Sequence, residues 1–164
     1  MSAIERIQAV LDARVLVPQL MVVPTTGAME SEIDNEQLLL GRSFCADHVE
    51  ILRRWNGIGL EVVRLFGCGD SAGQSGRISA LQFISGYGVE GAIAVGADPS
   101  GFIYIQLADQ RLFSLDSDGG EVTQVAKDLD DFFERLVFGT DASSFAGEEW
   151  LADLRSAGII DKQS

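Results

Sequence analysis

The sequence predicts an α+β fold, in which a single antiparallel sheet forms a meander and helices pack mainly on one of its faces. Two observations predict this class. Apolar residues recur at helical spacing near both ends of the chain, whereas its middle has short apolar runs separated by turn sequences. The 164 residues are 46% apolar, which is enough for one core, and no linker divides them. We therefore expect a single domain over residues 1–164.

Five segments have the pattern of amphipathic helices. In the first, Ile4, Ile7 and Leu11 fall on one face, with charged and polar residues between them. The segment 128–138 has the clearest stripe, and we expect that stripe in the core together with Trp55 and Ile105. The stripe consists of Leu129, Phe132, Phe133 and Leu136. The predicted helices span 3–14, 26–39, 46–55, 128–138 and 148–157.

The segments between these helices have strand character. Turn residues such as Asp98-Pro99-Ser100-Gly101, typical of a type I turn, separate the apolar runs at hairpin spacing. The predicted strands lie near 60–66, 91–97, 101–108, 111–115 and 121–125. Two segments are less regular. Residues 15–23 are interrupted by Pro18 and predict an extended segment or edge strand, whereas 78–84 fit either a strand or a short helix.

Charge limits the classes of partner. Twelve basic residues stand against 25 acidic ones, and the net charge of −13 argues against nucleic acid or an anionic membrane surface as the partner. No apolar run approaches the roughly 20 residues that span a bilayer, and the first residues lack the apolar stretch of a secretory signal. We expect a cytoplasmic protein that binds a basic protein partner.

Few residues suggest catalysis or metal binding. Cys45, Cys68 and His48 are too few for a structural zinc site, although a hydrolase using Cys45 and His48 remains an alternative. Asp116 and Asp118 have the spacing of a calcium loop, but its twelfth position is Lys127 where a glutamate is required. We expect no metal, no cofactor and no catalytic residue.

Acidic residues gather in the turns of the predicted meander. Residues 90–164 contain 15 acidic and 5 basic side chains, against 10 and 7 in residues 1–89. A cluster of carboxylates would steer a basic partner toward the protein, with exposed aromatic residues such as Tyr87, Phe102 or Tyr104 as anchors. The predicted partner-binding residues are Asp98, Tyr104, Asp109, Asp116, Asp118 and Glu121.

Three segments together resemble the SUKH superfamily. They are a helix that ends in Trp55-Asn56-Gly57, a strand, turn and returning strand over 93–104, and a closing helix that begins near Val125-Ala126. The resemblance covers residues 28–138, so that the helices 3–14 and 148–157 are additions to it. The sequence departs from the family pattern at Arg42-Ser43-Phe44, where Leu-Pro is usual.

The resemblance implies a function as well as a fold. The superfamily contains many bacterial immunity proteins that neutralise polymorphic toxins, and a yeast regulator of cell-wall assembly. It therefore implies a non-enzymatic module that binds a cognate toxin domain. The alternative is a regulatory scaffold that binds an endogenous protein. The oligomeric state stays open.

Overall fold

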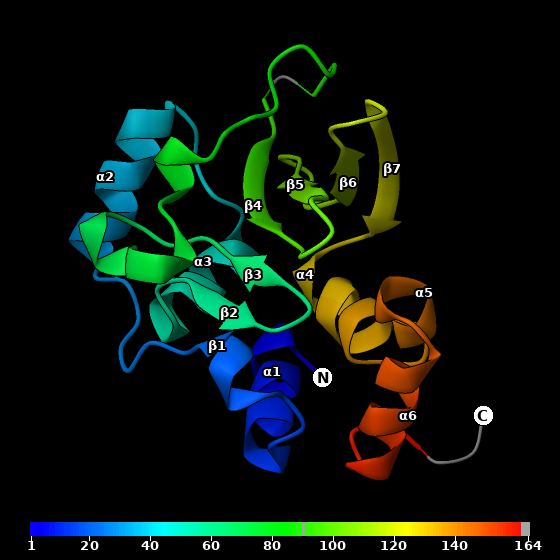
Figure 1. The fold of residues 1–164 in the computed structure, drawn as a ribbon. Helices are drawn as coiled ribbons and strands as arrows, with labels where there is room; N and C mark the ends of the chain where they lie inside the picture. The colour runs from blue at the N-terminus through cyan, green and yellow to red at the C-terminus, as the bar shows by residue number, and fades with distance from the viewer. Residues whose placement is uncertain (90, 162–164) are drawn as a thin grey trace.

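A computed structural model describes residues 1–89 and 91–161, and it has the predicted α+β class (Figure 1). One seven-stranded sheet contains the strands in chain order, and every neighbouring pair is antiparallel, so the sheet is a meander. The strands are β1 (Met21–Val22), β2 (Ile58–Leu60), β3 (Arg64–Leu65), β4 (Ile93–Ala97), β5 (Ile103–Gln106), β6 (Leu112–Asp116) and β7 (Glu121–Ala126).

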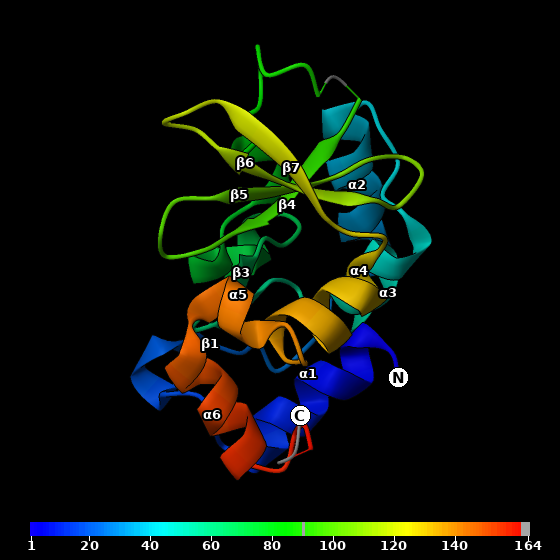
Figure 2. The same cartoon turned by 90° about the vertical axis from the view of Figure 1, so that its right-hand side faces the viewer.

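Helices surround this sheet. They are α1 (Ala3–Ala13), α2 (Glu30–Leu40), α3 (Ala46–Arg54), α4 (Leu129–Asp131), α5 (Ala142–Ala146) and α6 (Glu148–Ser156), with the 3-10 turns η1 (Pro18–Leu20), η2 (Asp70–Ser75) and η3 (Ile78–Ala80). A π-helix, η4 (Phe132–Val137), continues α4. In Figures 1 and 2, α1, α4, α5 and α6 lie on one side of strands β4 to β7. Among the described helices, none has the length and apolar character needed to cross a membrane.

The predicted strand 60–66 is wrong, because this segment is a tight hairpin. The Leu60 amide donates to the Val63 carbonyl at 2.8 Å, and Glu61 takes a left-handed φ of 68°. β2 and β3 then pair as neighbours in the sheet. The sequence pattern does not predict this turn, because apolar residues flank Glu61 and the turn itself contains no glycine, proline or asparagine.

The second predicted helix starts later than the sequence suggests. It was expected from Thr26, but α2 begins at Glu30, and the Met29 amide donates to the Glu32 side chain at 2.9 Å. The preceding residues run extended along α3, where the Ala28 amide donates to the Leu52 carbonyl at 2.8 Å. Gly27 permits this approach, because a Cβ there would lie 1.7 Å from the Arg53 carbonyl oxygen. The ambiguous segment 78–84 contains the short helical turn η3.

The core is centred on the aromatic residues of η4. Phe132 and Phe133 are fully buried, as predicted, with Trp55, Ile105 and Leu129. Leu136 was also expected in the core, but it is only half-buried. In η4 the Phe138 amide donates to the Phe133 carbonyl at 3.0 Å, an i to i+5 bond that widens the turn. This extra residue in the turn brings Val137 and Phe138 into the core and leaves Leu136 at its margin.

Candidate functional site

The turns of the meander separate the predicted acidic residues into two groups. In an antiparallel meander, successive turns alternate between the two ends of the sheet, and Figure 2 shows this for β4 to β7. The β4–β5 turn carries Asp98, and the β6–β7 turn carries Asp116 and Asp118 with Glu121 beside it. Asp109 lies in the β5–β6 turn at the opposite end, so the predicted carboxylates do not all gather at one rim.

Asp109 is also neutralised locally. Its side chain accepts hydrogen bonds from the Arg111 amide at 3.1 Å and from Arg111 Nε at 2.7 Å. These bonds, together with the charge of the guanidinium, lower the pKa of the Asp109 carboxyl. The positive charge of Arg111 therefore offsets the negative charge of the Asp109 carboxylate. Asp109 is therefore removed from the candidate site.

The strand register places three of the remaining predicted residues, Tyr104, Asp116 and Glu121, on one face. Residues that pair directly in neighbouring strands point to the same side, and Tyr104 pairs with Ser114, which pairs with Thr123. Asp116 pairs with Glu121 further along the same side. Phe102 precedes Tyr104 by two residues and lies on the same side, and Val125 lines the same groove as these residues. We call this surface the acidic face; it comprises Phe102, Tyr104, Ser114, Asp116, Glu121, Thr123 and Val125.

A groove of about 340 Å³ lies on the acidic face, between the sheet and the helices η4 and α5. Tyr104 and Phe145 stack against each other in its wall with ring centroids 5.8 Å apart, and Phe102 in its lining is 37% exposed. Its lining is mainly apolar with a few polar groups, as in many binding sites. The groove is lined by Asp98, Ser100, Phe102, Tyr104, Ser114, Val125, Leu136, Ser144 and Phe145.

Tyr104 forms part of the groove wall and is not the exposed anchor that the sequence predicts. Only 5% of its surface is exposed, because Phe132 and Phe145 pack against the ring. Its hydroxyl donates to Asp98 Oδ2 at 2.7 Å, and burial raises the pKa of that hydroxyl. Strand alternation identifies the face on which Tyr104 lies but cannot show that helices cover it.

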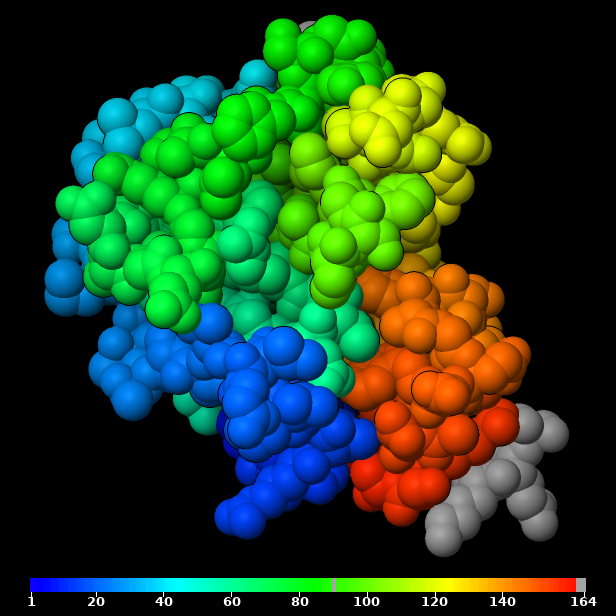
Figure 3. Space-filling model, in the orientation of Figure 1, coloured from blue at the N-terminus to red at the C-terminus, as the bar shows by residue number. Residues whose placement is uncertain are grey.

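The acidic turns hold their own shape through carboxylate hydrogen bonds. Asp98 Oδ1 accepts from the Ser100 amide at 2.9 Å and from the Phe102 amide at 3.2 Å. Asp116 Oδ1 accepts from the Asp118 amide at 3.1 Å. These bonds fix the position of each carboxylate in its turn, and of the two only Asp98 lines the groove. Figure 3 shows the β6–β7 hairpin, in yellow, at the molecular surface.

Three groove residues come from helices and were not predicted as site residues. Ser144 and Phe145 lie on α5, whose five residues carry no pattern that predicts a helix. Leu136 was expected in the core, and the wide turn of η4 brings it to the groove. A sequence signal for these positions is absent because their role depends on packing between distant segments.

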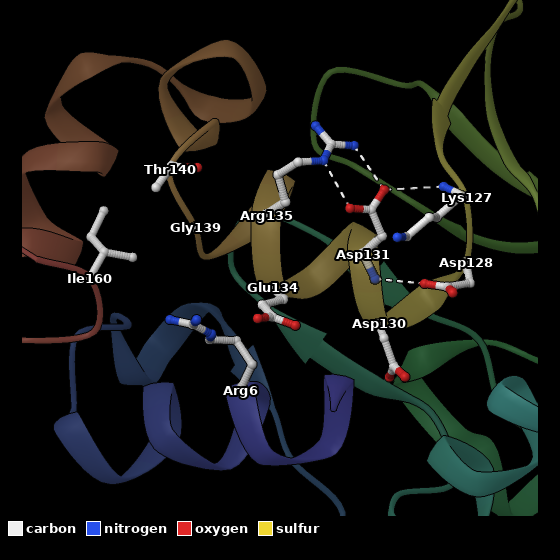
Figure 4. Close-up of a pocket in the computed structure, with 10 residues that line it drawn as sticks. All are labelled: Arg6, Lys127, Asp128, Asp130, Asp131, Glu134, Arg135, Gly139, Thr140 and Ile160. Atoms are coloured by element: carbon white, nitrogen blue, oxygen red, sulfur yellow. Dashed lines mark hydrogen bonds and ion pairs between the residues drawn. The ribbon is translucent and has the colours of Figure 1, made fainter. Parts of the chain in front are cut away.

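A second cavity, of about 530 Å³, lies between α1 and the α4–η4 helix (Figure 4). Several of its lining charges already have partners, although the buried Arg6 Nε has none among the described residues. Arg135 binds Asp131 at 2.9 Å and Asp141 at 2.7 Å, and Asp130 accepts from the Ala3 amide at 2.7 Å. Such paired charges hold the helices together and are not available to bind a ligand strongly.

A third cavity, of about 250 Å³, contains Cys45 and His48. The Cys45 thiol donates to the Leu107 carbonyl at 3.2 Å, and burial raises its pKa. His48 is 1% exposed, and burial lowers its pKa to about 4. A nucleophilic pair needs a thiol that gives its proton to the imidazole, whereas this thiol is directed to a carbonyl. Burial therefore favours the uncharged form of both the Cys45 thiol and the His48 imidazole.

The buried His48 predicts a loss of stability on acidification. The unfolded chain binds a proton on His48 near pH 6.5, whereas the folded protein keeps the ring neutral down to about pH 4. The neutral His48 therefore costs no stability above pH 6.5. As the pH falls from 6.5 toward 4, the free energy of unfolding declines by up to about 3 kcal/mol, because the unfolded chain binds a proton that the folded protein does not. Urea unfolding of the wild type and of His48→Gln across this range measures it. The wild type should show the steeper decline, and parallel curves would contradict the prediction.

Comparisons with known proteins add no relative. A scan against protein-family models and a search of curated proteins found no match to this chain.

Proposed function

We propose that this protein is a non-enzymatic binding module of the immunity type, which occupies a basic toxin domain and blocks it. The observation that carries the proposal is the strand register, which sets Asp116 and Glu121 on the same face as Phe102. A partner on this surface meets an apolar groove and carboxylates together. Membership of the SUKH superfamily and action in the cytoplasm, inside the cell that makes the toxin, belong to the same proposal.

The two parts of the surface have different roles in binding. The groove offers aromatic rings, with Phe102 partly exposed, and such side chains anchor partners in desolvated pockets. Asp116, Asp118 and Glu121 lie at the edge of this surface, where charge raises the rate of encounter more than the lifetime of the complex. The overall charge of −13 favours a basic partner over an acidic one.

Neutralising the β6–β7 carboxylates should slow association with a basic toxin domain encoded beside this gene. Asp116→Asn, Asp118→Asn and Glu121→Gln together keep side-chain size and the Asp116 acceptor oxygen but remove the charge. We expect the association rate at low salt to fall about tenfold. The difference should shrink at physiological ionic strength, where charges are screened beyond about 8 Å. Stopped-flow or surface-based kinetics across a salt series measures both quantities.

A matched control removes the same number of charges elsewhere. Asp34→Asn, Asp109→Asn and Glu149→Gln change three exposed carboxylates that lie away from the acidic face. This variant should lose much less of the association rate than the first. Equal rates and equal salt slopes for the two variants would mean that the acidity serves only solubility, and the acidic face would then not be the binding surface.

A further inference from the structure

The sheet ends in two edges that differ in how they are protected. At one end, β1 has two residues and is bounded by Pro18 and Pro24, which have no amide hydrogen to pair with another strand. At the other end, β7 has six residues, and none of them is Pro, Lys or Arg. Figure 2 shows β7 in front of the other strands with no helix over it. Between the two edges, β7 is therefore the one that can accept another strand.

Only the first part of β7 is open. At its C-terminal end, Arg135 donates to the Val125 carbonyl at 2.7 Å, and the Lys127 amide donates to Asp131 at 3.1 Å. The register also becomes irregular between Gln124 and Ala126. Residues 121–124 precede this closure, and three of the four are exposed. An edge strand presents its alternate amide and carbonyl groups to the outside, so this stretch offers a short template for pairing.

The negative charge around this edge favours a basic segment as the added strand. Glu121 lies on the strand itself, and Asp116 and Asp118 lie in the adjoining turn. A second copy of this chain would bring a net charge of −13 against the same end of the sheet. An extended basic segment would instead pair its backbone with β7 and its side chains with these carboxylates. Alternate side chains of such a segment would continue the acidic face beside Thr123.

We propose that residues 121–124 of β7 pair with an extended, basic segment of the partner protein, which adds an eighth strand to the sheet. This inference rests on the proposed function and specifies how the partner is engaged. Backbone pairing fixes the direction of the added segment, whereas the carboxylates favour lysine or arginine at alternate positions.

A synthetic peptide tests this pairing on the full chain. The probe is a ten-residue peptide in which lysine alternates with valine and threonine, and the readout is amide hydrogen exchange measured by NMR at low ionic strength. We expect exchange within Val122–Gln124 to slow at least tenfold when the peptide is saturating. A matched peptide, N-methylated at two adjacent central residues, keeps the charge but cannot pair through either edge, and should bind at least tenfold more weakly.

Two proline variants block the protein side of the contact. Neighbouring amides of a strand point to opposite edges. One of the two substitutions, Val122→Pro or Thr123→Pro, therefore removes an outward amide and leaves the pairing of β7 with β6 intact. The variant with the unchanged Tm is the one that spares this pairing. That variant should lose the peptide contact. If both variants are unstable, the comparison between the plain and the N-methylated peptide decides the question.

The outcomes separate this inference from the proposed function. Equal binding of the two peptides, absence of binding, or protection confined to another part of the chain would overturn the edge pairing. Dimers that protect β7 in the absence of peptide would assign the edge to a second copy and also overturn it. Charge neutralisation could slow toxin association while the proline variant does not. This result would support the acidic face as the binding surface and overturn the pairing of β7 with an eighth strand. If neither change affects association, the acidic face itself is not the site.

Discussion

Phe132→Ala is expected to lower the free energy of unfolding by about 3–5 kcal/mol. The ring is fully buried and lies 5.1 Å from both Tyr104 and Phe133, and 5.8 Å from Phe145, measured between ring centroids. Its removal leaves a cavity at the point where η4, α5 and the sheet meet, and the surrounding rings cannot all move to fill it. Urea unfolding monitored by circular dichroism measures the loss.

The matched control for this variant is Phe102→Ala. Phe102 has the same side chain but is 37% exposed at the margin of the groove, and its loss should cost about 1 kcal/mol or less. It should instead weaken binding to a partner in the groove. A loss below about 1 kcal/mol for Phe132→Ala would show that η4 does not pack as described.

Glu36→Gln is expected to lower the free energy of unfolding by about 3 kcal/mol. Glu36 is completely buried, and its two oxygens accept from Arg77 Nε at 2.6 Å, the Gly69 amide at 3.0 Å and the Ser79 amide at 2.9 Å. These donors join α2 to the segment 69–79, which contains the 3-10 turn η2 and the start of η3. The amide of glutamine replaces one acceptor oxygen with a donor, so at least one of the three groups loses its partner.

The effect of Glu36→Gln should depend on pH. Burial opposes ionisation of Glu36, but the hydrogen bonds from Arg77, Ser79 and Gly69 outweigh it and lower its pKa below 4.5. The contribution of ionised Glu36 to the free energy of unfolding is therefore complete above pH 4.5. It is lost as the pH falls through the lower pKa that Glu36 has in the folded protein. The difference between wild type and variant should narrow in that acidic range.

Glu30→Gln serves as the matched control for Glu36→Gln. Glu30 pairs with Arg53 at 2.6 Å, but both side chains are exposed, so this ion pair contributes little to stability. A loss for Glu36→Gln as small as that for Glu30→Gln would contradict the role given to the buried carboxylate.

The parts of the fold that the sequence predicts well are those set by local chemistry. Turn residues between short apolar runs predict β4 to β7, and the spacing of Leu129, Phe132 and Phe133 predicts the helix that packs against them. The hairpin at Glu61 was missed because its turn residues resemble those of a strand. The π-helix was missed because its extra residue follows from packing around Phe133 and Phe138, and no local pattern records it.

The candidate site was predictable only in part, for the same reason. Turn chemistry identifies Asp98, Asp116 and Asp118 as surface acids, and the alternation of turns in a meander is enough to place Asp109 at the other end. Tyr104 is buried because η4 and α5, which follow it in the sequence, pack over its ring.

The role of Asn56 also depends on a contact between segments that are separate in the sequence. Its side chain donates to the Cys68 carbonyl at 3.0 Å and accepts from the Cys68 amide at 2.6 Å.

The wide turn of η4 positions residues of the core and residues of the proposed binding surface at the same time. One additional residue in the turn brings Val137 and Phe138 inward and leaves Leu136 beside the groove. An insertion or deletion within residues 132–137 would rotate both sets of side chains together. Variation of the groove in related chains is therefore expected to arise by substitution at Leu136 and on α5, while the length of this helix stays constant.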